Sequence, residues 1–358
     1  MKIAFPAGSL SYRGTHVALY DYAYFNQEIL GNESLICVDD LNPGPTDLLK
    51  KFENKFECIK VKNWEDASKK CLAANCDAAY VLKSGEVDSQ YLIDFPNFIH
   101  AVFPQPYKEQ HGAVYAFVSE WLSRECSNGA IPFVPHIINL PEVESNFRKF
   151  LNIPNDAIVF GCYGGYDSFD IDFVHKTLID LCFKTKKIWF VFMNIKPFAV
   201  HERLIFMPAT TDPVQKKEFI NTCDAMLHAR GMGESFGLAC GEFSVSNRPV
   251  ITYGLSPQRA HIHMLGNKAM IYRGPNELFK LLIDFDPKWS SRENWDAYSI
   301  NFSAKPVMDK FNEVFIKNIF SKKNNNIKLN LIDRVMVEIY NVKRRLRSRS
   351  RKFHHGFS

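Results

Sequence analysis

Short apolar segments alternate with helix-favouring segments along most of the chain, and this alternation restricts the fold more than any other feature. Strands that alternate with helices form parallel βαβ units with helices on the faces of the sheet. The sequence therefore predicts an α/β fold. Strands are expected at residues 2–7, 34–38, 58–61, 78–82, 98–103, 114–119, 157–163, 188–194, 204–207, 250–253 and 269–272, and helices at 15–30, 46–56, 64–75, 120–126, 172–183, 213–222 and 276–284.

A length of 358 residues predicts two domains. Pro135 and Pro141 bracket an extended apolar segment that is typical of a crossover between domains. We expect an N-terminal domain at residues 1–145 and a C-terminal domain at 146–304. An amphipathic crossing helix at 305–320 and a basic tail at 321–358 complete the prediction. The apolar face of the crossing helix consists of Val307, Met308, Phe311, Val314, Phe315 and Ile319.

Charge is distributed unevenly. The whole chain carries a net charge of +5, yet Lys322–Lys352 holds eleven basic and two acidic residues, a net of +9, which leaves −4 for the remainder. An apolar stripe on this basic segment predicts a second helix. It indicates either an anionic membrane surface as a partner or a solvated end that could contact nucleic acid; we favour the membrane and expect no nucleic acid. The stripe consists of Leu331, Val335, Ile339, Val342 and Leu346.

Nine cysteines without a Cys-x-x-Cys pair indicate free thiols in a reducing compartment. No apolar run reaches the roughly 18 residues of a membrane span, and the N-terminus leads directly into a predicted strand. We therefore expect a cytoplasmic protein, either free or peripheral at a membrane.

The most informative stretch is Gly231–Phe243, which follows an apolar run and precedes the strand at 250–253. Its pattern predicts a strand, a glycine loop, a helix and a strand. Gly231, Gly233 and Gly237 let the backbone approach a ligand without Cβ clashes. The start of the helix offers unpaired N–H groups and a partial positive charge, which suit a phosphate.

Two carboxylates flank this phosphate-binding position. Glu234 in the loop can accept hydrogen bonds from sugar hydroxyls, and Glu242 in the helix can accept them from a ribose. Their separation suits a diphosphate between them. In open α/β sheets, ligands bind beyond the carboxyl ends of the strands, where this loop is expected to lie.

The Glu234-to-Glu242 spacing within Glu-Ser-Phe-Gly-Leu, followed by a Pro-Val-Ile strand, resembles the E-x7-E motif of retaining glycosyltransferases of the GT-B fold. A looser similarity extends from Met1 to about Phe320. The resemblance implies two Rossmann-like domains that face each other across a cleft. It implies a nucleoside diphosphate sugar of UDP or GDP type as the donor, a glycan or lipid-linked acceptor hydroxyl, retention of configuration, and no metal or other cofactor.

The resemblance also implies roles for individual residues. Glu234 would hold the donor sugar, Glu242 the ribose, and His100 the acceptor hydroxyl. Gly14 and Thr15 would approach the diphosphate or the acceptor. The remaining donor-binding positions are Gly164, Gly165, Ser235, Phe236, Gly237 and Leu238.

One departure from the family pattern concerns the leaving group. The family usually has an Arg and a Lys after the first strand of its C-terminal domain, but the segment Tyr163–Phe169 has no basic residue. One cation at ~4 Å from the leaving diphosphate is worth about 4 kcal/mol at an effective dielectric constant near 20. We therefore expect another cation there, with Arg230 as the first candidate and Lys196 as the second.

Two motifs are weaker metal candidates. Asp170 and Asp172 match an Asp-x-Asp pattern, but they lie at a predicted helix start, where acids are favoured. His261 and His263 have strand-like spacing without a third ligand. The sequence also contains no Gly-x-Gly-x-x-Gly, no Walker loop and no Gly-x-Ser-x-Gly elbow, which argues against a dinucleotide dehydrogenase, a P-loop NTPase and an α/β-hydrolase.

Three functions remain open. The first is a metal-independent glycosyltransferase. The second is a sugar-nucleotide epimerase of the same fold, which needs no acceptor. The third is a catalytically silent protein that binds sugar nucleotides, which the missing basic pair would explain.

Overall fold

The structure, a computed structural model, describes residues 1–319 and 328–355. The chain divides into two compact units. Unit 1 consists of Met1–Ile137 and Asn301–Asn341, and unit 2 of Ile138–Ile300 and Val342–Ser358. Phe320, at the end of the predicted amphipathic helix, lies outside the described residues, and so do residues 322–326, a run of Lys and Asn that is typical of a linker.

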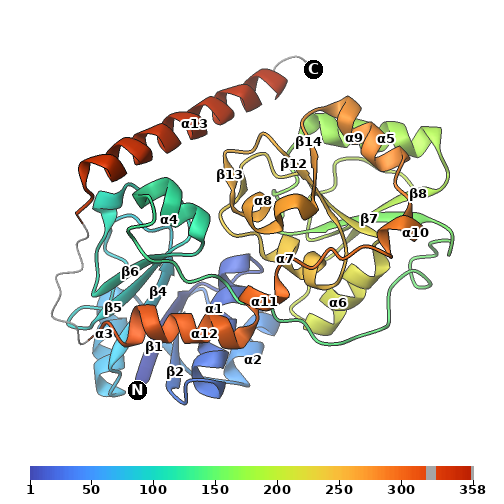
Figure 1. Cartoon of the computed structure of the whole chain (residues 1–358). Coiled ribbons are helices and arrows are strands. Elements are labelled where there is room, and N and C mark those ends of the chain that lie inside the picture. Colours follow the sequence, from blue (N-terminus) through green and yellow to red (C-terminus); the bar gives the residue numbers. More distant parts are fainter. Residues whose placement is uncertain (320–327, 356–358) are drawn as a thin grey trace. The chain divides into compact units, whose positions relative to one another are not determined.

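Unit 1 is built on a six-stranded parallel sheet with the strand order β3-β2-β1-β4-β5-β6 (Figure 1). Its strands are β1 (Lys2–Gly8), β2 (Glu33–Asp39), β3 (Glu57–Val61), β4 (Ala78–Lys83), β5 (Asn97–Ala101) and β6 (Val114–Phe117). The helices between them are α1 (Gly14–Glu28), α2 (Thr46–Glu53), α3 (Trp64–Ala73) and α4 (Glu120–Ser127), with a short 3₁₀ turn η1 (Tyr107–Glu109).

Unit 2 repeats this plan with the order β14-β12-β10-β7-β8-β9, and its strands are also parallel. The strands are β7 (Ile158–Tyr163), β8 (Ile188–Met193), β9 (Leu204–Met207), β10 (Ala225–His228), β12 (Val250–Tyr253) and β14 (Ala269–Tyr272). The connecting helices are α5 (Asp172–Lys184), α6 (Pro213–Thr222), α7 (Leu238–Val245), α8 (Ala260–Leu265), α9 (Pro275–Ile283), α10 (Pro287–Ser290) and α11 (Ser299–Phe302), with a 3₁₀ turn η2 (Gly266–Lys268).

Both sheets therefore have the same topology. Counted within its unit, each runs 3-2-1-4-5-6, the order of a Rossmann-like domain. The order reverses between the first and fourth strands of each unit, which are β1 and β4 in unit 1 and β7 and β10 in unit 2. A crevice forms at this switch point because the connections on either side leave the sheet in opposite directions.

Local sequence explains why these elements form. The run Ile-Trp-Phe-Val-Phe-Met of β8 is almost entirely buried, as expected for a parallel strand covered on both faces. Helix α4 begins where the Ser119 hydroxyl accepts a hydrogen bond from the Leu122 N–H, and it ends at Asn128 with a left-handed backbone. Helix α6 starts with the Asp212 cap followed by Pro213, which suits the first helical position.

The C-terminal segment returns to unit 1. Helix α12 (Ala304–Phe311) continues as a π-helical turn, η3 (Asn312–Ile316), in which the Lys317 N–H reaches the Asn312 carbonyl. Phe311 and Phe315 are fully buried and pack on Tyr80 at centroid distances of 5.3 and 5.8 Å. Five of the six residues of the predicted apolar face are buried, and Ile319 is half-buried. The regular helix gives way to a wider turn in which both phenylalanines are in the core.

The basic tail forms the long helix α13 (Leu331–His355), as predicted. No helix among the described residues has the length and apolarity needed to cross a membrane. All nine cysteines are free thiols.

Candidate functional site

The glycine-rich stretch lies at the switch point of unit 2. Strands β7 and β10 are hydrogen-bonded neighbours, and their carboxyl ends lead into two loops. Gly164 and Gly165 follow β7, while Arg230 and the glycine loop follow β10. Because ligands of open α/β sheets bind in this crevice, the topology brings two predicted groups of donor-binding residues to one edge.

The glycine loop needs glycine for steric reasons. Gly233 has a φ of +76°, and a Cβ on it would lie 1.9 Å from the Gln258 carbonyl oxygen. Gly237 has a φ of +93° and directly precedes α7. The close approach at Gly233 lets β11 (Gly233–Glu234) pair with β13 (Gln258–Arg259). This pairing fixes the backbone that presents the Glu234 side chain.

Two side chains hold the Glu234 carboxylate: Arg230 from the same loop and His228 from the end of β10. Arg230 Nη1 donates to Glu234 Oε2 at 2.9 Å, and His228 Nε2 lies 3.2 Å from Oε1. Burial raises the pKa of Glu234, but the charge of Arg230 and the hydrogen bond to His228 outweigh burial and lower the pKa to about 2. Glu234 is therefore an anion at neutral pH, ready to accept hydrogen bonds.

A buried polar chain fixes the His228 ring from behind. Its Nδ1 lies 2.9 Å from Thr252 Oγ1, which in turn lies 2.9 Å from His261 Nε2. The Tyr272 hydroxyl donates to the His228 carbonyl oxygen. These partners come from β12, α8 and β14, so Glu234 is supported by much of the sheet edge.

Glu242 has a different environment. Its carboxylate lies in the second turn of α7, is 3% exposed, and contacts Lys216 Nζ at 2.7 Å. The Tyr163 hydroxyl donates to its other oxygen. The second acid of the predicted pair is thus joined to α6 and to the end of β7. Lys216 is a third cation at this edge of the sheet, in addition to Arg230 and Lys196.

Sequence reasoning overlooked Lys216 and His228. Lys216 lies in the first turns of a helix that starts at the carboxyl end of the sheet, and His228 is the last residue of β10. A search for polar residues at the ends of strands and the starts of helices next to the switch point would have found both.

The other predicted donor residues occupy varied positions. Ser235 and Phe236 continue the loop, Phe236 is 2% exposed, and Leu238 opens α7. The carbonyl oxygen of Gly164 accepts from Asn194 Nδ2 at 2.7 Å, which ties the loop after β7 to the end of β8. Lys196 is exposed in the loop after β8.

Three predicted residues belong to unit 1 and form no part of the unit 2 cluster. Gly14 is the first residue of α1, and Thr15 is the second. The helix predicted at 15–30 begins one residue earlier, so Thr15 lies inside it and the residue before the helix is Arg13. His100 lies inside β5, within the strand predicted at 98–103.

The surroundings of His100 are those of a core residue. The side chain is 0% exposed, its Nδ1 lies 2.6 Å from the Tyr80 hydroxyl, and its Nε2 lies 2.9 Å from the Val134 carbonyl. A carbonyl oxygen only accepts, so Nε2 carries the proton and Nδ1 accepts from Tyr80. Burial lowers the pKa of His100 to about 3. With both nitrogens engaged inside unit 1, His100 has no part in the function proposed below.

The two weak metal candidates are structural. Asp170 Oδ1 accepts from the Gly231 N–H at 2.6 Å, and Asp172 begins α5 as predicted. His261 and His263 lie on α8, so the strand-like interpretation of their spacing is wrong. Across residues 1–319 and 328–355, no group of three or more His, Cys, Asp or Glu side chains could hold a metal ion.

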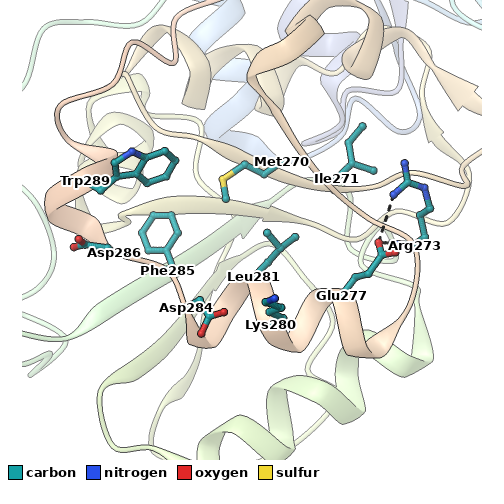
Figure 2. A pocket seen from close by; sticks show the side chains of 10 residues that line it. All are labelled: Met270, Ile271, Arg273, Glu277, Lys280, Leu281, Asp284, Phe285, Asp286 and Trp289. Atoms are coloured by element: carbon teal, nitrogen blue, oxygen red, sulfur yellow. Dashed lines mark hydrogen bonds and ion pairs between the residues drawn. The ribbon is translucent and has the colours of Figure 1, made fainter.

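A separate pocket of about 660 Å³ lies beside the edge strand β14 (Figure 2). Five of its lining side chains are apolar and five are charged, and the charged ones include the Arg273–Glu277 ion pair. None of the predicted donor-binding residues lines it. The lining residues are Met270, Ile271, Arg273, Glu277, Lys280, Leu281, Asp284, Phe285, Asp286 and Trp289.

Comparisons with known proteins rest on structure alone. No protein-family model matches the chain, and no curated protein matches its sequence. Anabaena Alr3699/HepE in complex with UDP and glucose is similar at a TM-score of 0.65 and 13% identity, covering 87% of this chain and 98% of that one. WaaG, a glycosyltransferase involved in lipopolysaccharide biosynthesis, is similar at 0.62 and 11%, covering 87% and 99%.

A third similar structure is a putative UDP-N-acetylglucosamine 2-epimerase from Listeria monocytogenes, at a TM-score of 0.58 and 11% identity, covering 88% of this chain and 97% of that one. These likenesses span almost the full length of the known structures. Together with the two Rossmann-like units, they confirm the predicted α/β fold of GT-B type.

Proposed function

We propose that this chain is a glycosyltransferase that moves a sugar from a nucleoside diphosphate sugar to an acceptor hydroxyl. The observation that carries the proposal is the anionic Glu234 in a glycine loop at the switch point of unit 2, directly before the start of α7. The likeness to HepE structures bound to UDP and to UDP-glucose supports a donor of this class. UDP is the first nucleotide to test, with GDP as the alternative.

In the proposed complex, Glu234 accepts hydrogen bonds from hydroxyls of the donor sugar. The backbone N–H groups of Ser235 to Leu238 face the sugar and the diphosphate, since a helix start favours phosphate. The loop at Gly164 and Gly165 lies beside them because β7 and β10 are neighbours. Glu242 takes the ribose with its remaining lone pairs, because a carboxylate can accept about four hydrogen bonds.

The leaving diphosphate requires a cation, and three candidates lie on this edge. Arg230 is closest in sequence to the loop, yet it already pairs with Glu234, so part of its charge is neutralised. Lys196 is exposed, and Lys216 is shared with Glu242. We propose that Arg230 acts on the donor together with Glu234 as one unit, and that Lys216 or Lys196 supplies the additional charge.

Further parts of the proposal are the stereochemistry, the metal requirement and the acceptor. Transfer proceeds with retention on one face of the donor, where the leaving phosphate helps to deprotonate the acceptor, so no protein nucleophile is named. The reaction needs no metal. The acceptor is a glycan or a lipid-linked glycan, and Gly14 and Thr15 at the start of α1 remain its proposed contacts in unit 1.

The proposed location is the cytoplasmic side of an anionic membrane, where lipid-linked acceptors are found. The basic helix α13 supports this, since clusters of Lys and Arg on an amphipathic helix favour anionic lipid.

A second function is an epimerase acting on the donor alone. The likeness to the putative UDP-N-acetylglucosamine 2-epimerase from Listeria monocytogenes supports it. A third is a silent sugar-nucleotide-binding protein, supported by the absence of a basic residue in Tyr163–Phe169.

Incubation of the full chain with UDP-, GDP- and dTDP-sugars separates the three functions. Release of nucleoside diphosphate only when an acceptor glycan is present supports transfer. A changed sugar nucleotide without any acceptor supports the epimerase. A rise in melting temperature with nucleotide but no product supports the silent protein, because ligand binding to the folded state raises apparent stability. No shift with any nucleotide would contradict all three.

Replacing Arg230 tests the proposed unit with Glu234. Arg230→Ala should lower turnover by about a hundredfold, within the range found when a charge-stabilising donor is removed. It should cost at most about 2 kcal/mol of folding stability, because Glu234 loses its ion-pair partner. Arg273→Ala is the matched control, because Arg273 pairs with Glu277 at the same four-residue spacing away from the loop. Near-normal turnover in Arg230→Ala would remove Arg230 from the role.

A further inference from the structure

Helix α13 exposes an apolar stripe that the fold of the chain leaves uncovered. Successive helical residues are about 100° apart, so residues spaced three or four apart share one side. Six such residues face solvent with 41 to 77% of their surface exposed: Leu331, Ile332, Val335, Ile339, Val342 and Leu346. Contiguous apolar surface of this kind on an otherwise polar helix marks an interaction site.

In the first part of α13, which belongs to unit 1, the opposite side of the helix is buried. Val337 is only 6% exposed, and Asp333 accepts a hydrogen bond from Asn128 Nδ2 at 2.9 Å. Asn128 is the C-terminal cap of α4. The start of α13 is therefore anchored through one face, and the apolar stripe is turned away from that face. Figure 1 shows α13 as one continuous helix.

Basic residues border the stripe. Helix α13 carries eight Lys and Arg residues and two acids, a net of +6. At about 100° per residue, Lys343 falls beside one edge of the stripe, and Arg345 falls beside the other together with Glu338; all three are exposed. An apolar stripe with cations along its edges is the pattern of a helix that lies in a membrane interface.

We infer that α13 is a membrane-docking helix that lies flat on an anionic bilayer, with its apolar stripe among the acyl chains and its flanking cations at the lipid phosphates. An anionic bilayer satisfies both halves of the pattern. Nucleic acid would use the cations but leave the stripe in water. A second copy would cover the stripe but bring cationic edges together, because flanking charges decide which helices pair. The inference rests on the proposed function, because the bilayer is the surface on which the protein would meet a lipid-linked acceptor.

The test uses the full chain and co-sedimentation with vesicles. Binding is expected to vesicles of phosphatidylcholine mixed with phosphatidylglycerol, to be weak on phosphatidylcholine alone, and to fall as salt rises. The double variant Ile339→Asp/Val342→Asp should bind these vesicles at least about tenfold more weakly, because it places negative charges where the helix contacts the acyl chains. Both positions are exposed, so the fold is retained.

Reversal of the flanking charges tests the second half of the pattern. Lys343→Glu/Arg345→Glu should also reduce binding by about tenfold or more. Lys149→Glu/Lys176→Glu makes the same change in net charge at exposed sites of unit 2, and Leu41→Asp places an acid at an exposed apolar site of unit 1. Both controls should bind like the parent chain.

Three outcomes would overturn the inference: equal binding of the stripe variant and the parent chain, a dimer in light scattering that the stripe variant abolishes, or binding to duplex DNA that survives loss of the stripe. Vesicle binding requires no donor or acceptor. The sugar-nucleotide panel is run without lipid. Failure of the membrane-docking inference and failure of the proposed glycosyltransferase function are therefore seen in separate measurements.

Discussion

At the scale of single residues, the informative finding is how differently the two glutamates of the predicted pair are placed. Glu234 is held by Arg230 and His228 and keeps its charge, with 20% of its side chain exposed. Glu242 is enclosed by Lys216 and Tyr163. The spacing of the two glutamates in the sequence therefore does not show that the Glu234 carboxylate is partly exposed in the loop, whereas the Glu242 carboxylate is buried in α7.

Stability between pH 5 and pH 2 should report the charge of Glu234. Its folded pKa of about 2 lies below the ordinary 4.5, so its stabilising contribution is complete above about pH 4.5 and is lost as pH falls toward 2. The contribution is on the order of 2 kcal/mol after allowance for partial exposure. Glu234→Gln should lose less unfolding free energy over this range than the parent chain.

Urea unfolding at several pH values measures that difference. The parent-minus-variant comparison removes the acids that both proteins share. Glu277→Gln is the control, because this glutamate also pairs with an arginine four residues away but half of its side chain is exposed. Parallel pH curves for the parent chain and Glu234→Gln would show that Glu234 titrates normally.

At the scale of elements, the Lys216–Glu242 pair joins α6 to α7. Removing one partner of a buried ion pair leaves an uncompensated charge, which costs more than losing both. Lys216→Met should therefore destabilise unit 2 by about 3 kcal/mol. Lys216→Met/Glu242→Gln should recover much of that loss, because the amide needs no cation.

The double-mutant cycle is measured by urea unfolding, with nucleotide-induced thermal shifts as a second readout. We expect the double variant to regain stability but not its response to UDP, since both proposed ligand contacts are altered. Lys217→Met is a neighbouring control on the same helix, where the lysine contacts the Ser246 hydroxyl and no carboxylate. If the effects of Lys216→Met and Glu242→Gln on the free energy of unfolding simply add in the double variant, the two side chains are not coupled.

At the scale of the whole molecule, the end of the chain completes the core of its beginning. Phe311 packs on Tyr22 and Tyr80, more than 200 residues earlier in the sequence. Unit 1 therefore cannot finish its core until the C-terminal segment is present, although the six strands of its sheet come from the first third of the chain.

Phe311→Ala should destabilise unit 1 by about 3 to 5 kcal/mol, the usual cost of truncating a buried aromatic side chain. Hydrogen exchange resolved by segment should show faster exchange in β1, β4 and β5 and little change in β7, β10 and β12. Ile300→Ala, at a residue that is 85% exposed, should change neither unit. Uniform loss of protection in both sheets would show that the units unfold together.

The positions of several helices and strands along the chain were predictable from the sequence alone. Strands such as β9 and β12 and the helix α6 have the predicted bounds, because apolar periodicity, caps and prolines act over a few residues. The glycine loop was predictable for the same reason: a backbone that must turn tightly beside another strand requires glycine at Gly233 and Gly237.

Contacts between distant segments were decided only by the tertiary structure. An isolated histidine after apolar residues looks the same in sequence whether it faces solvent or, like His100, lies between Tyr80 and the Val134 carbonyl. The Lys216–Glu242 pair and the anchoring of α13 through Asn128 likewise join residues 26 and 205 positions apart. Sequence determined which elements form and which residues can carry the chemistry. Tertiary structure decided which of them meet, because burial and pairing depend on neighbours that local sequence does not specify.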